Sequence, residues 1–224
     1  MSRVLVIGDT HAPCLRKGYI EHCARVRDAW QTDTVVHIGD VVDWTAISFH
    51  DNDPRSPSAG EEIDLARPQV HAIYSEFSEA VILTGNHDSL PARRMVAMGV
   101  PVELLREPDE FWETPGWNYV ERFGVHEIDE VLYKHGDSGK GGMHSAYKNA
   151  KENFCSMVQG HMHSQASVEY YANERAKVFG MQVGCGADHH KLQMQYGRKY
   201  NAKPLISCGV VIDGEHATLE MMTL

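Results

Sequence analysis

The chain has 224 residues, of which 42% are apolar, and a formal net charge of -10. Its length suits one domain with a substantial core, so we expect residues 1–224 to form a single domain. The acidic balance disfavours non-specific binding to nucleic acid, and no apolar run is long enough to span a membrane. No secretory apolar segment precedes the first predicted strand, so we expect a cytoplasmic protein without membrane contacts.

Three runs in the first half are rich in β-branched and aliphatic side chains. Residues 4–7, 34–38 and 80–84 have this composition, which indicates strands that are buried on both faces. Each run ends in glycine followed by a polar residue. Residues 18–30 and 61–77, between these runs, place apolar side chains at helical spacing.

The order strand, helix, strand, helix, strand is typical of a largely parallel sheet with right-handed crossovers. In such sheets the ligand site lies beyond the carboxyl ends of the strands. Pro68 falls inside the second predicted helix and is expected to kink or restart it.

The second half is richer in strands and contains one predicted helix, at residues 143–153. Short strands are expected at residues 117–123, 125–129, 131–135, 154–158, 167–171, 176–183, 205–212 and 216–222. The last four alternate apolar and polar residues, as antiparallel strands do. The sequence alone therefore indicates an α/β first half and a β-rich second half.

The number of cysteines is odd, and no C-x-x-C pair occurs. The five are Cys14, Cys23, Cys155, Cys185 and Cys208. Cys155 and Cys208 lie in apolar runs that resemble strands. This usage favours buried free thiols in a reducing compartment over a disulfide framework.

Five short motifs offer oxygen or imidazole ligands, and each falls at the predicted end of a strand. In chain order they are Asp9-Thr10-His11, Gly39-Asp40-Val41-Val42-Asp43, Gly85-Asn86-His87-Asp88, His135-Gly136-Asp137 and Gly160-His161-Met162-His163. A single His-x-His pair is most often an ordinary feature of a strand. Five such motifs in order are a specific signal.

This series resembles the calcineurin-like metallophosphoesterase family, whose pattern is GD-x-H, GD-x-x-D, GNH-[DE], an isolated histidine and GH-x-H. The resemblance runs from residue 8 to residue 163. It implies a four-layer α-β-β-α sandwich, in which two mixed β-sheets are flanked by helices. It also implies two divalent metal ions and hydrolysis of a phosphate ester by a metal-bridging hydroxide.

The resemblance divides the ligands between two ions. Asp9, His11, Asp40 and His163 would hold one ion, and Asp40, Asn86, His135 and His161 the other. Two ions about 3.5–4 Å apart need a bridging carboxylate, for which we select Asp40. The mixed oxygen and imidazole shell favours manganese, with iron, zinc or nickel as alternatives. The glycines before these residues are expected to let the backbone turn sharply.

The resemblance gives His87 a different role. It would contact the phosphate and protonate or stabilise the leaving group, and Asp88 would orient its imidazole. The sequence leaves two roles for Asp43: it either supports a metal ligand or caps the residues that follow it.

Three further features lie outside the motifs. Lys140, in a glycine-rich loop, is either a phosphate contact or a solvated side chain. The patch at Arg198, Lys199 and Lys203 is either a phosphate or base contact or an exposed hairpin tip. His189-His190, beside Asp188, is not expected to supply ligands, because both ligand shells are already full.

The predicted function is metal-dependent hydrolysis of a phosphomonoester or phosphodiester. Among substrates, a small phosphodiester or a general phosphomonoester is preferred. A nuclease of the DNA-repair type is the main alternative. A silent metal-binding scaffold ranks below both, because such a protein would be expected to lose His87 or Asp40, and the chain has both residues. The sequence does not indicate an oligomeric state.

Overall fold

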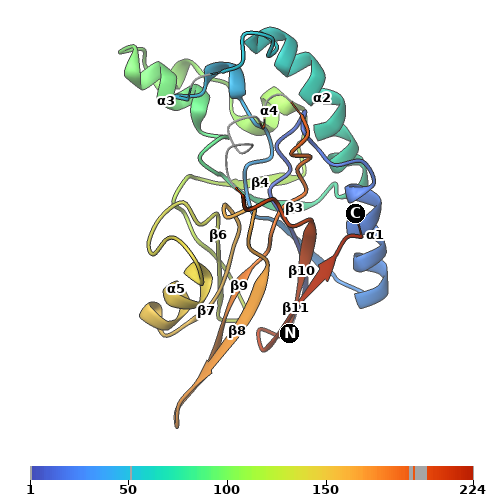
Figure 1. Ribbon diagram of the computed structural model, residues 1–224, viewed down its shortest axis with the longest axis vertical. Helices are drawn as coiled ribbons and strands as arrows, with labels where there is room; N and C mark the ends of the chain where they lie inside the picture. Colours follow the sequence, from blue (N-terminus) through green and yellow to red (C-terminus); the bar gives the residue numbers. More distant parts are fainter. Residues whose placement is uncertain (1, 51, 192–193, 195–200, 224) are drawn as a thin grey trace.

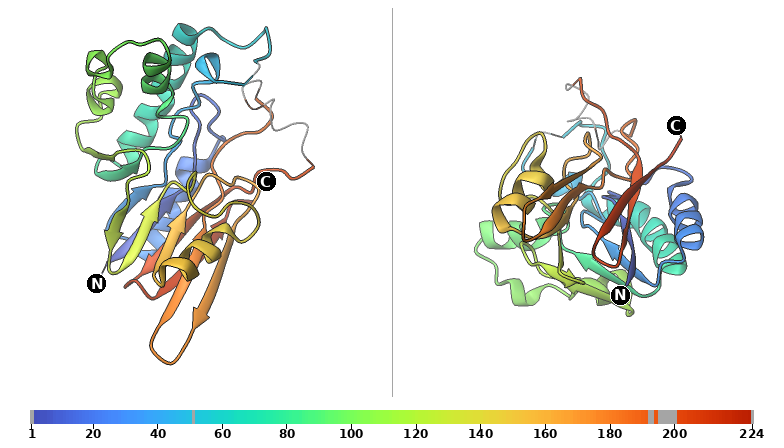
Figure 2. Two further views of the ribbon diagram at one scale, coloured as in Figure 1. Left: turned by 90° about the vertical axis from the view of Figure 1, so that its left-hand side faces the viewer. Right: turned by 90° about the horizontal axis from the view of Figure 1, so that it is seen from below.

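The computed structural model describes residues 2–50, 52–191, 194 and 201–223. Its strands form two sheets that face each other, and helices cover the outer faces of both (Figure 1 and Figure 2). Each sheet mixes parallel and antiparallel pairs. This arrangement confirms the α-β-β-α sandwich that the sequence motifs predict.

The first sheet has six strands in the order β11-β10-β1-β2-β3-β4. They are β1 (Arg3–Ile7), β2 (Thr34–His37), β3 (Ala80–Leu83), β4 (Trp117–Val120), β10 (Ser207–Ile212) and β11 (His216–Met221). The first four are mutually parallel, as the alternation of strands and helices predicts, and β10 and β11 extend the sheet in antiparallel fashion. The carboxyl ends of β1, β2 and β3 therefore lie at one edge of this sheet.

The second sheet has five strands in the order β5-β6-β7-β9-β8. They are β5 (His126–Ile128), β6 (Val131–Lys134), β7 (Ser156–Gln159), β8 (Ser167–Ala172) and β9 (Lys177–Gln182). Its three central strands are parallel, and only the outer strands β5 and β8 pair in antiparallel fashion. Alternation along β9 therefore predicts its antiparallel pairing with β8 but not its parallel pairing with β7.

Three of the helices cover the sheets, and the other two lie at the end of the sandwich where the strands have their carboxyl ends. They are α1 (Tyr19–Trp30), α2 (Ala59–Glu76), α3 (Leu90–Ala97), α4 (Pro108–Trp112) and α5 (Ser145–Asn153), with short 3-10 turns η1 (Thr45–Ile47) and η2 (Val102–Leu104). Helices α1 and α2 cover the first sheet, and α5 covers the second (Figure 2). Helices α3 and α4, which no clear periodicity predicts, lie beyond the carboxyl ends of the strands (Figure 1).

Helix α2 runs through Pro68 without a break, so the expected restart at that residue is wrong. Proline has no backbone N–H group, so the carbonyl oxygen of Asp64 lacks its usual helical partner. Both Asp64 and Pro68 are exposed to solvent. Water can satisfy that carbonyl. Ser58, the residue before the helix, is its N-cap and forms a capping box with Glu61.

Two apolar clusters hold the layers together, and β1 contributes to both. Val4 and Val6 point into the core between the sheets, while Leu5 and Ile7 point towards α1 and α2. This alternation follows from the period of two along a strand and explains why the whole run is apolar.

All five cysteines are free thiols, and four of them are buried. Cys155 is the exception, because it precedes β7 and is partly exposed instead of lying in the strand. Among the described residues, no helix combines the length and the apolar character needed to cross a bilayer.

Candidate metal centre

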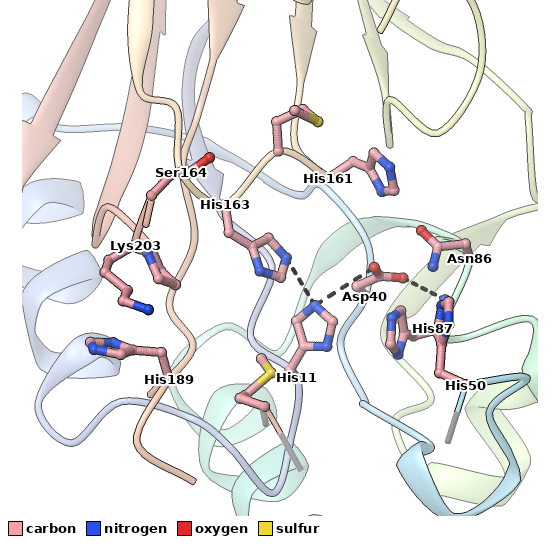
Figure 3. A pocket seen from close by; sticks show the side chains of 14 residues that line it. His11, Asp40, His50, Asn86, His87, His161, His163, Ser164, His189 and Lys203 are labelled. Atoms are coloured by element: carbon pink, nitrogen blue, oxygen red, sulfur yellow. Dashed lines mark hydrogen bonds and ion pairs between the residues drawn. The ribbon is translucent and has the colours of Figure 1, made fainter. Parts of the chain in front are cut away.

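The strand ends of both sheets bring the predicted ligands to one place. Asp9 and His11 follow β1, Asp40 follows β2 and Asn86 follows β3 in the first sheet. In the second sheet His135 follows β6, and His161 and His163 follow β7. Five of these side chains line a cavity of about 460 Å³, namely His11, Asp40, Asn86, His161 and His163 (Figure 3). Asp9 and His135 contact them from behind.

Asp9, His11 and His163 form the first group. The Nε2 atom of His163 lies 3.1 Å from Oδ2 of Asp9 and 3.1 Å from Nε2 of His11. These donor atoms lie within 4.8 Å of one another. Their spacing allows all three to bind one cation.

Asp40, Asn86, His135 and His161 form the second group. Nε2 of His135 lies 3.1 Å from Oδ1 of Asn86 and 3.3 Å from Oδ2 of Asp40. The side chain of His161 joins the same cluster as Asp40 and His135. His161 and His163, two residues apart, therefore contribute to different groups.

Asp40 lies between the two groups. Its Oδ2 atom is 3.3 Å from Nε2 of His135 on one side and 3.6 Å from Nε2 of His11 on the other. The side chain is 2% exposed. A carboxylate in this position can contact cations on both sides, as the bridging role requires.

Hydrogen bonds hold two of the imidazoles in the form that binds metal. Nδ1 of His11 donates to Oδ1 of Asp43 at 2.8 Å, and Nδ1 of His135 donates to the carbonyl oxygen of Ile38 at 2.9 Å. Because both partners only accept, each Nδ1 atom carries a proton, which leaves Nε2 as the nitrogen that can bind a metal. In each residue Nε2 faces the other donors, so the residues fit a metal.

Three of the ligands have an unusual backbone conformation. His11, Asp40 and His161 adopt positive φ angles of 47°, 49° and 67°. Such conformations are uncommon for residues other than glycine. Nine other described non-glycine residues share this conformation, most of them in turns and at helix ends, so the case for the cluster depends on its side-chain geometry.

The glycines beside the ligands act mainly through close approach. Gly39 has a φ of 104°, as a sharp turn requires. Gly85 and Gly160 do not need a positive φ. A Cβ atom at Gly85 would lie 2.1 Å from Oδ1 of Asp40, and one at Gly160 would lie 2.3 Å from Oδ1 of Asp9. Any side chain there would displace a predicted ligand.

The electrostatics of the centre indicate an excess of buried negative charge. Burial raises the pKa of Asp40, but the nearby His135 and His87 outweigh it and hold that pKa well below its usual range. Burial lowers the pKa of His135, but Asp40 and Asp9 raise it to about 10. A cation at this site would compete with the proton on His135 for the same atom.

His87 lines the cavity but is oriented by a different residue from the one predicted. Its Nδ1 atom donates to the carbonyl oxygen of Asp43 at 2.5 Å and lies 3.4 Å from Oδ1 of the same residue. The Asp88 carboxylate accepts instead from the backbone N–H groups of Gly85 and Val42, at 3.0 and 3.2 Å. In the structure Asp43, and not Asp88, is therefore the residue in hydrogen-bond contact with the imidazole of His87.

The charge on His87 follows from the same neighbours. Burial lowers the pKa of His87, but the negative charges of Asp40 and Asp43 outweigh this and raise it. Burial raises the pKa of Asp88 to about 7. The structure thus gives Asp43 the supporting role that its motif left open: it contacts both His11 and His87.

The residues that the sequence singled out beyond the five motifs lie in different places. His189 and Lys203 line the cavity opposite His50, Asn86 and His87 (Figure 3). Asp188, His189 and His190 form a separate, more exposed group. Lys140 pairs with Glu152 across 3.6 Å at the surface. Arg198 and Lys199 lie outside the described residues.

Sequence reasoning missed a buried amide network behind the centre. Oε1 of Gln182 accepts from Nε2 of Gln159 at 3.1 Å and from Oγ of Ser145 at 3.2 Å. Nε2 of Gln182 donates to the carbonyl oxygen of Gly160, which precedes His161. The only signal in the sequence is a glutamine at the end of each of two apolar strands.

Comparisons with known proteins agree with this architecture. A family model described as calcineurin-like phosphoesterase matches residues 2–191. No curated protein sequence matches the chain.

The solved structures that the chain is similar to have low sequence identity to it. Vacuolar protein sorting 29 from Cryptosporidium parvum is 16% identical, with 100% of this chain and 98% of that chain covered and a TM-score of 0.46. A metallophosphoesterase from Sphaerobacter thermophilus is 15% identical, with coverage of 99% and 88% and a TM-score of 0.44. The E. coli phosphoesterase YfcE is 11% identical, with coverage of 93% and 87% and a TM-score of 0.40.

Proposed function

The chain belongs to the calcineurin-like phosphoesterase family, and we propose that it hydrolyses phosphate esters with two divalent metal ions. The position of Asp40 carries this proposal. Its Oδ2 atom lies between Nε2 of His11 and Nε2 of His135, where one carboxylate can serve two cations.

Seven side chains would hold the ions. Asp9, His11, Asp40 and His163 are assigned to one ion, and Asp40, Asn86, His135 and His161 to the other. The mixed carboxylate, amide and imidazole donors favour manganese, with iron, zinc or nickel as alternatives. When bound, the ions supply Lewis acidity, which activates water and neutralises charge on a phosphoryl group.

His87 is assigned the role of acid and phosphate stabiliser. Its Nδ1 proton is donated to the carbonyl oxygen of Asp43, so a proton for the leaving group would come from Nε2. The negative charges of Asp40 and Asp43 raise the pKa of His87 and favour its protonated form. This form can donate to an oxygen atom of the substrate that carries developing negative charge.

The preferred substrates are small phosphodiesters or phosphomonoesters. A cavity of about 460 Å³ is of the size that small ligands occupy in proteins. The net charge of -10 disfavours long nucleic acid. A nuclease remains the alternative within the enzyme class, and a silent metal-binding scaffold is the non-enzymatic alternative.

The test is turnover of p-nitrophenyl phosphate and bis-p-nitrophenyl phosphate by manganese-reconstituted protein. We expect hydrolysis of at least one ester that stops when a chelator removes the metal. The control is the Asp40→Ala variant, which is expected to be inactive under the same conditions. Metal-loaded protein without turnover of either ester, or of single- or double-stranded DNA, would favour the scaffold.

A further inference from the structure

A second cavity, of about 280 Å³, opens beside the candidate metal centre. The two cavities share four lining residues, namely His50, Asn86, His87 and His161. Three of these, His50, Asn86 and His87, lie on one side of Asp40 (Figure 3). The two cavities therefore adjoin at these four residues.

Arginine side chains give the second cavity a positive wall. It is lined by Arg93, Arg122 and Asp137. Nε and Nη2 of Arg122 both contact Oδ2 of Asp137, at 3.0 and 2.8 Å, so these two charges offset each other. Among the described residues, no carboxylate lies within ion-pair distance of Arg93, because Asp137 pairs with Arg122. Burial and the neighbouring Arg122 lower the pKa of Arg93, and the more distant charge of Asp137 offsets this only in part.

Arg93 is held beside the centre by two contacts. Its Nη1 atom donates to the carbonyl oxygen of Asn86 at 3.3 Å. Its guanidinium group lies over the ring of Phe49, 4.9 Å from the ring centre. These contacts use one N–H group and one face, and a guanidinium has five N–H groups in all.

The loop that carries Phe49 is itself anchored. Nε of Arg94 donates to the carbonyl oxygen of Ile47 at 2.5 Å, and its guanidinium lies 4.0 Å from the centre of the Phe49 ring. Arg93 and Arg94 therefore both contact this ring. This packing limits the rotamer freedom that Arg93 would lose when it binds an anion.

Building on the proposed function, we propose that Arg93 binds a second phosphate group of the substrate. The scissile phosphate would occupy the metal centre, and the second phosphate would enter the adjoining cavity. A fixed guanidinium suits this role, because its planar N–H groups match two oxygens of one phosphate. The preferred substrate class is therefore a phosphate ester that carries another phosphate nearby.

The kinetic test uses substrates that differ only in the second phosphate. Phosphate release from adenosine 3′,5′-bisphosphate is compared with release from the two adenosine monophosphates. The measured quantity is kcat/KM for the bisphosphate divided by kcat/KM for the better monophosphate. We expect Arg93→Gln to lower this ratio by roughly 10- to 100-fold, the cost of one charge-assisted hydrogen bond. Arg25→Gln, at an exposed arginine of α1, is the matched control and should leave the ratio unchanged.

A binding test separates this inference from the proposed function. Calorimetry measures the affinity of metal-loaded protein for methylenebisphosphonate and for methylphosphonate, neither of which is hydrolysed. Arg93→Gln should weaken the bisphosphonate by a larger factor than the monophosphonate, even if no ester is turned over. Equal weakening of both, or an unchanged kinetic ratio in an active enzyme, would overturn the role of Arg93 and leave the proposed hydrolysis standing.

Discussion

Nδ1 of His11 lies 2.8 Å from Oδ1 of Asp43, and neither side chain has any exposed surface. The carboxylate can only accept, so it places the proton on Nδ1 and turns the Nε2 lone pair towards the predicted ligands. Asp43 also contacts His87, through its backbone carbonyl oxygen at 2.5 Å and through Oδ1 at 3.4 Å. One buried residue thus contacts both a proposed metal ligand and the proposed acid.

Asp43→Asn tests this support. The asparagine side chain can turn its N–H group towards His11, which then loses the acceptor for its Nδ1 proton. The substitution also removes the negative charge beside His87. We expect metal affinity to fall by roughly 10- to 100-fold, as is typical when a group that orients a ligand is lost. Calorimetric titration with manganese measures the change. Asp64→Asn, at an exposed position of α2, should bind metal like the wild type.

His87→Ala tests the acid role. The imidazole is not assigned to either ion, so the variant should bind the same number of metal ions as the wild type. Its kcat should fall by roughly 100- to 10,000-fold, the usual contribution of a positioned acid. Metal content and turnover are measured on the same preparation. Retention of most of the activity would remove His87 from the reaction.

Gln182→Leu tests the amide network behind the centre. Leucine would remove three buried hydrogen bonds, which Gln182 makes with the carbonyl oxygen of Gly160, the amide of Gln159 and the hydroxyl of Ser145. Gly160 and Gln159 each keep another partner. Each lost hydrogen bond costs about 0.5–1.5 kcal/mol, so urea unfolding should show a loss of about 2–4 kcal/mol. Metal affinity should also decrease, because Gly160 leads into His161. Lys177→Leu, at the exposed start of the same strand, should show neither effect.

Glu62→Gln tests a buried acid next to the loop that follows Asp43. The Glu62 carboxylate accepts from the N–H groups of Thr45 and Ala46, at 2.8 and 2.9 Å. Burial nevertheless raises its pKa from 4.5 to about 7. Between these two values the unfolded chain loses its proton first, so the stability contribution of Glu62 falls as the pH rises.

Glutamine does not titrate, so the wild type should lose stability relative to Glu62→Gln between pH 5 and pH 8. One pKa unit corresponds to about 1.4 kcal/mol, which puts the expected change at about 2–3 kcal/mol. Urea unfolding of both proteins across this range measures it. A constant difference between the two curves would show that Glu62 has the same pKa in the folded and unfolded chains.

The placement of the ligands could be predicted because the residue pattern at each strand end and the parallel order of the strands point to the same place. Each of β1, β2 and β3 is an apolar run that ends before a glycine and a polar residue, and parallel strands bring such ends together. The partner of His87 could not be predicted in this way. It depends on the path of residues 40–45, where Asp40 and Trp44 adopt positive φ angles that no sequence pattern signals.

Arg93 was also beyond sequence reasoning. It belongs to α3, a short helix without clear periodicity, and its position depends on Phe49 in a separate loop. Pro68 shows the opposite error. A strong local rule predicts a break there, but the solvent-exposed side of α2 tolerates the missing hydrogen bond.

The central claim is that Asp40 joins two metal ions in one cage. The most direct measurement is anomalous scattering from crystals of manganese-reconstituted protein, combined with elemental analysis of the wild type and of Asp40→Ala. The account predicts two peaks on either side of the Asp40 carboxylate in the wild type, and loss of metal in the variant. A wild-type centre without metal, or a variant that keeps both ions, would contradict it.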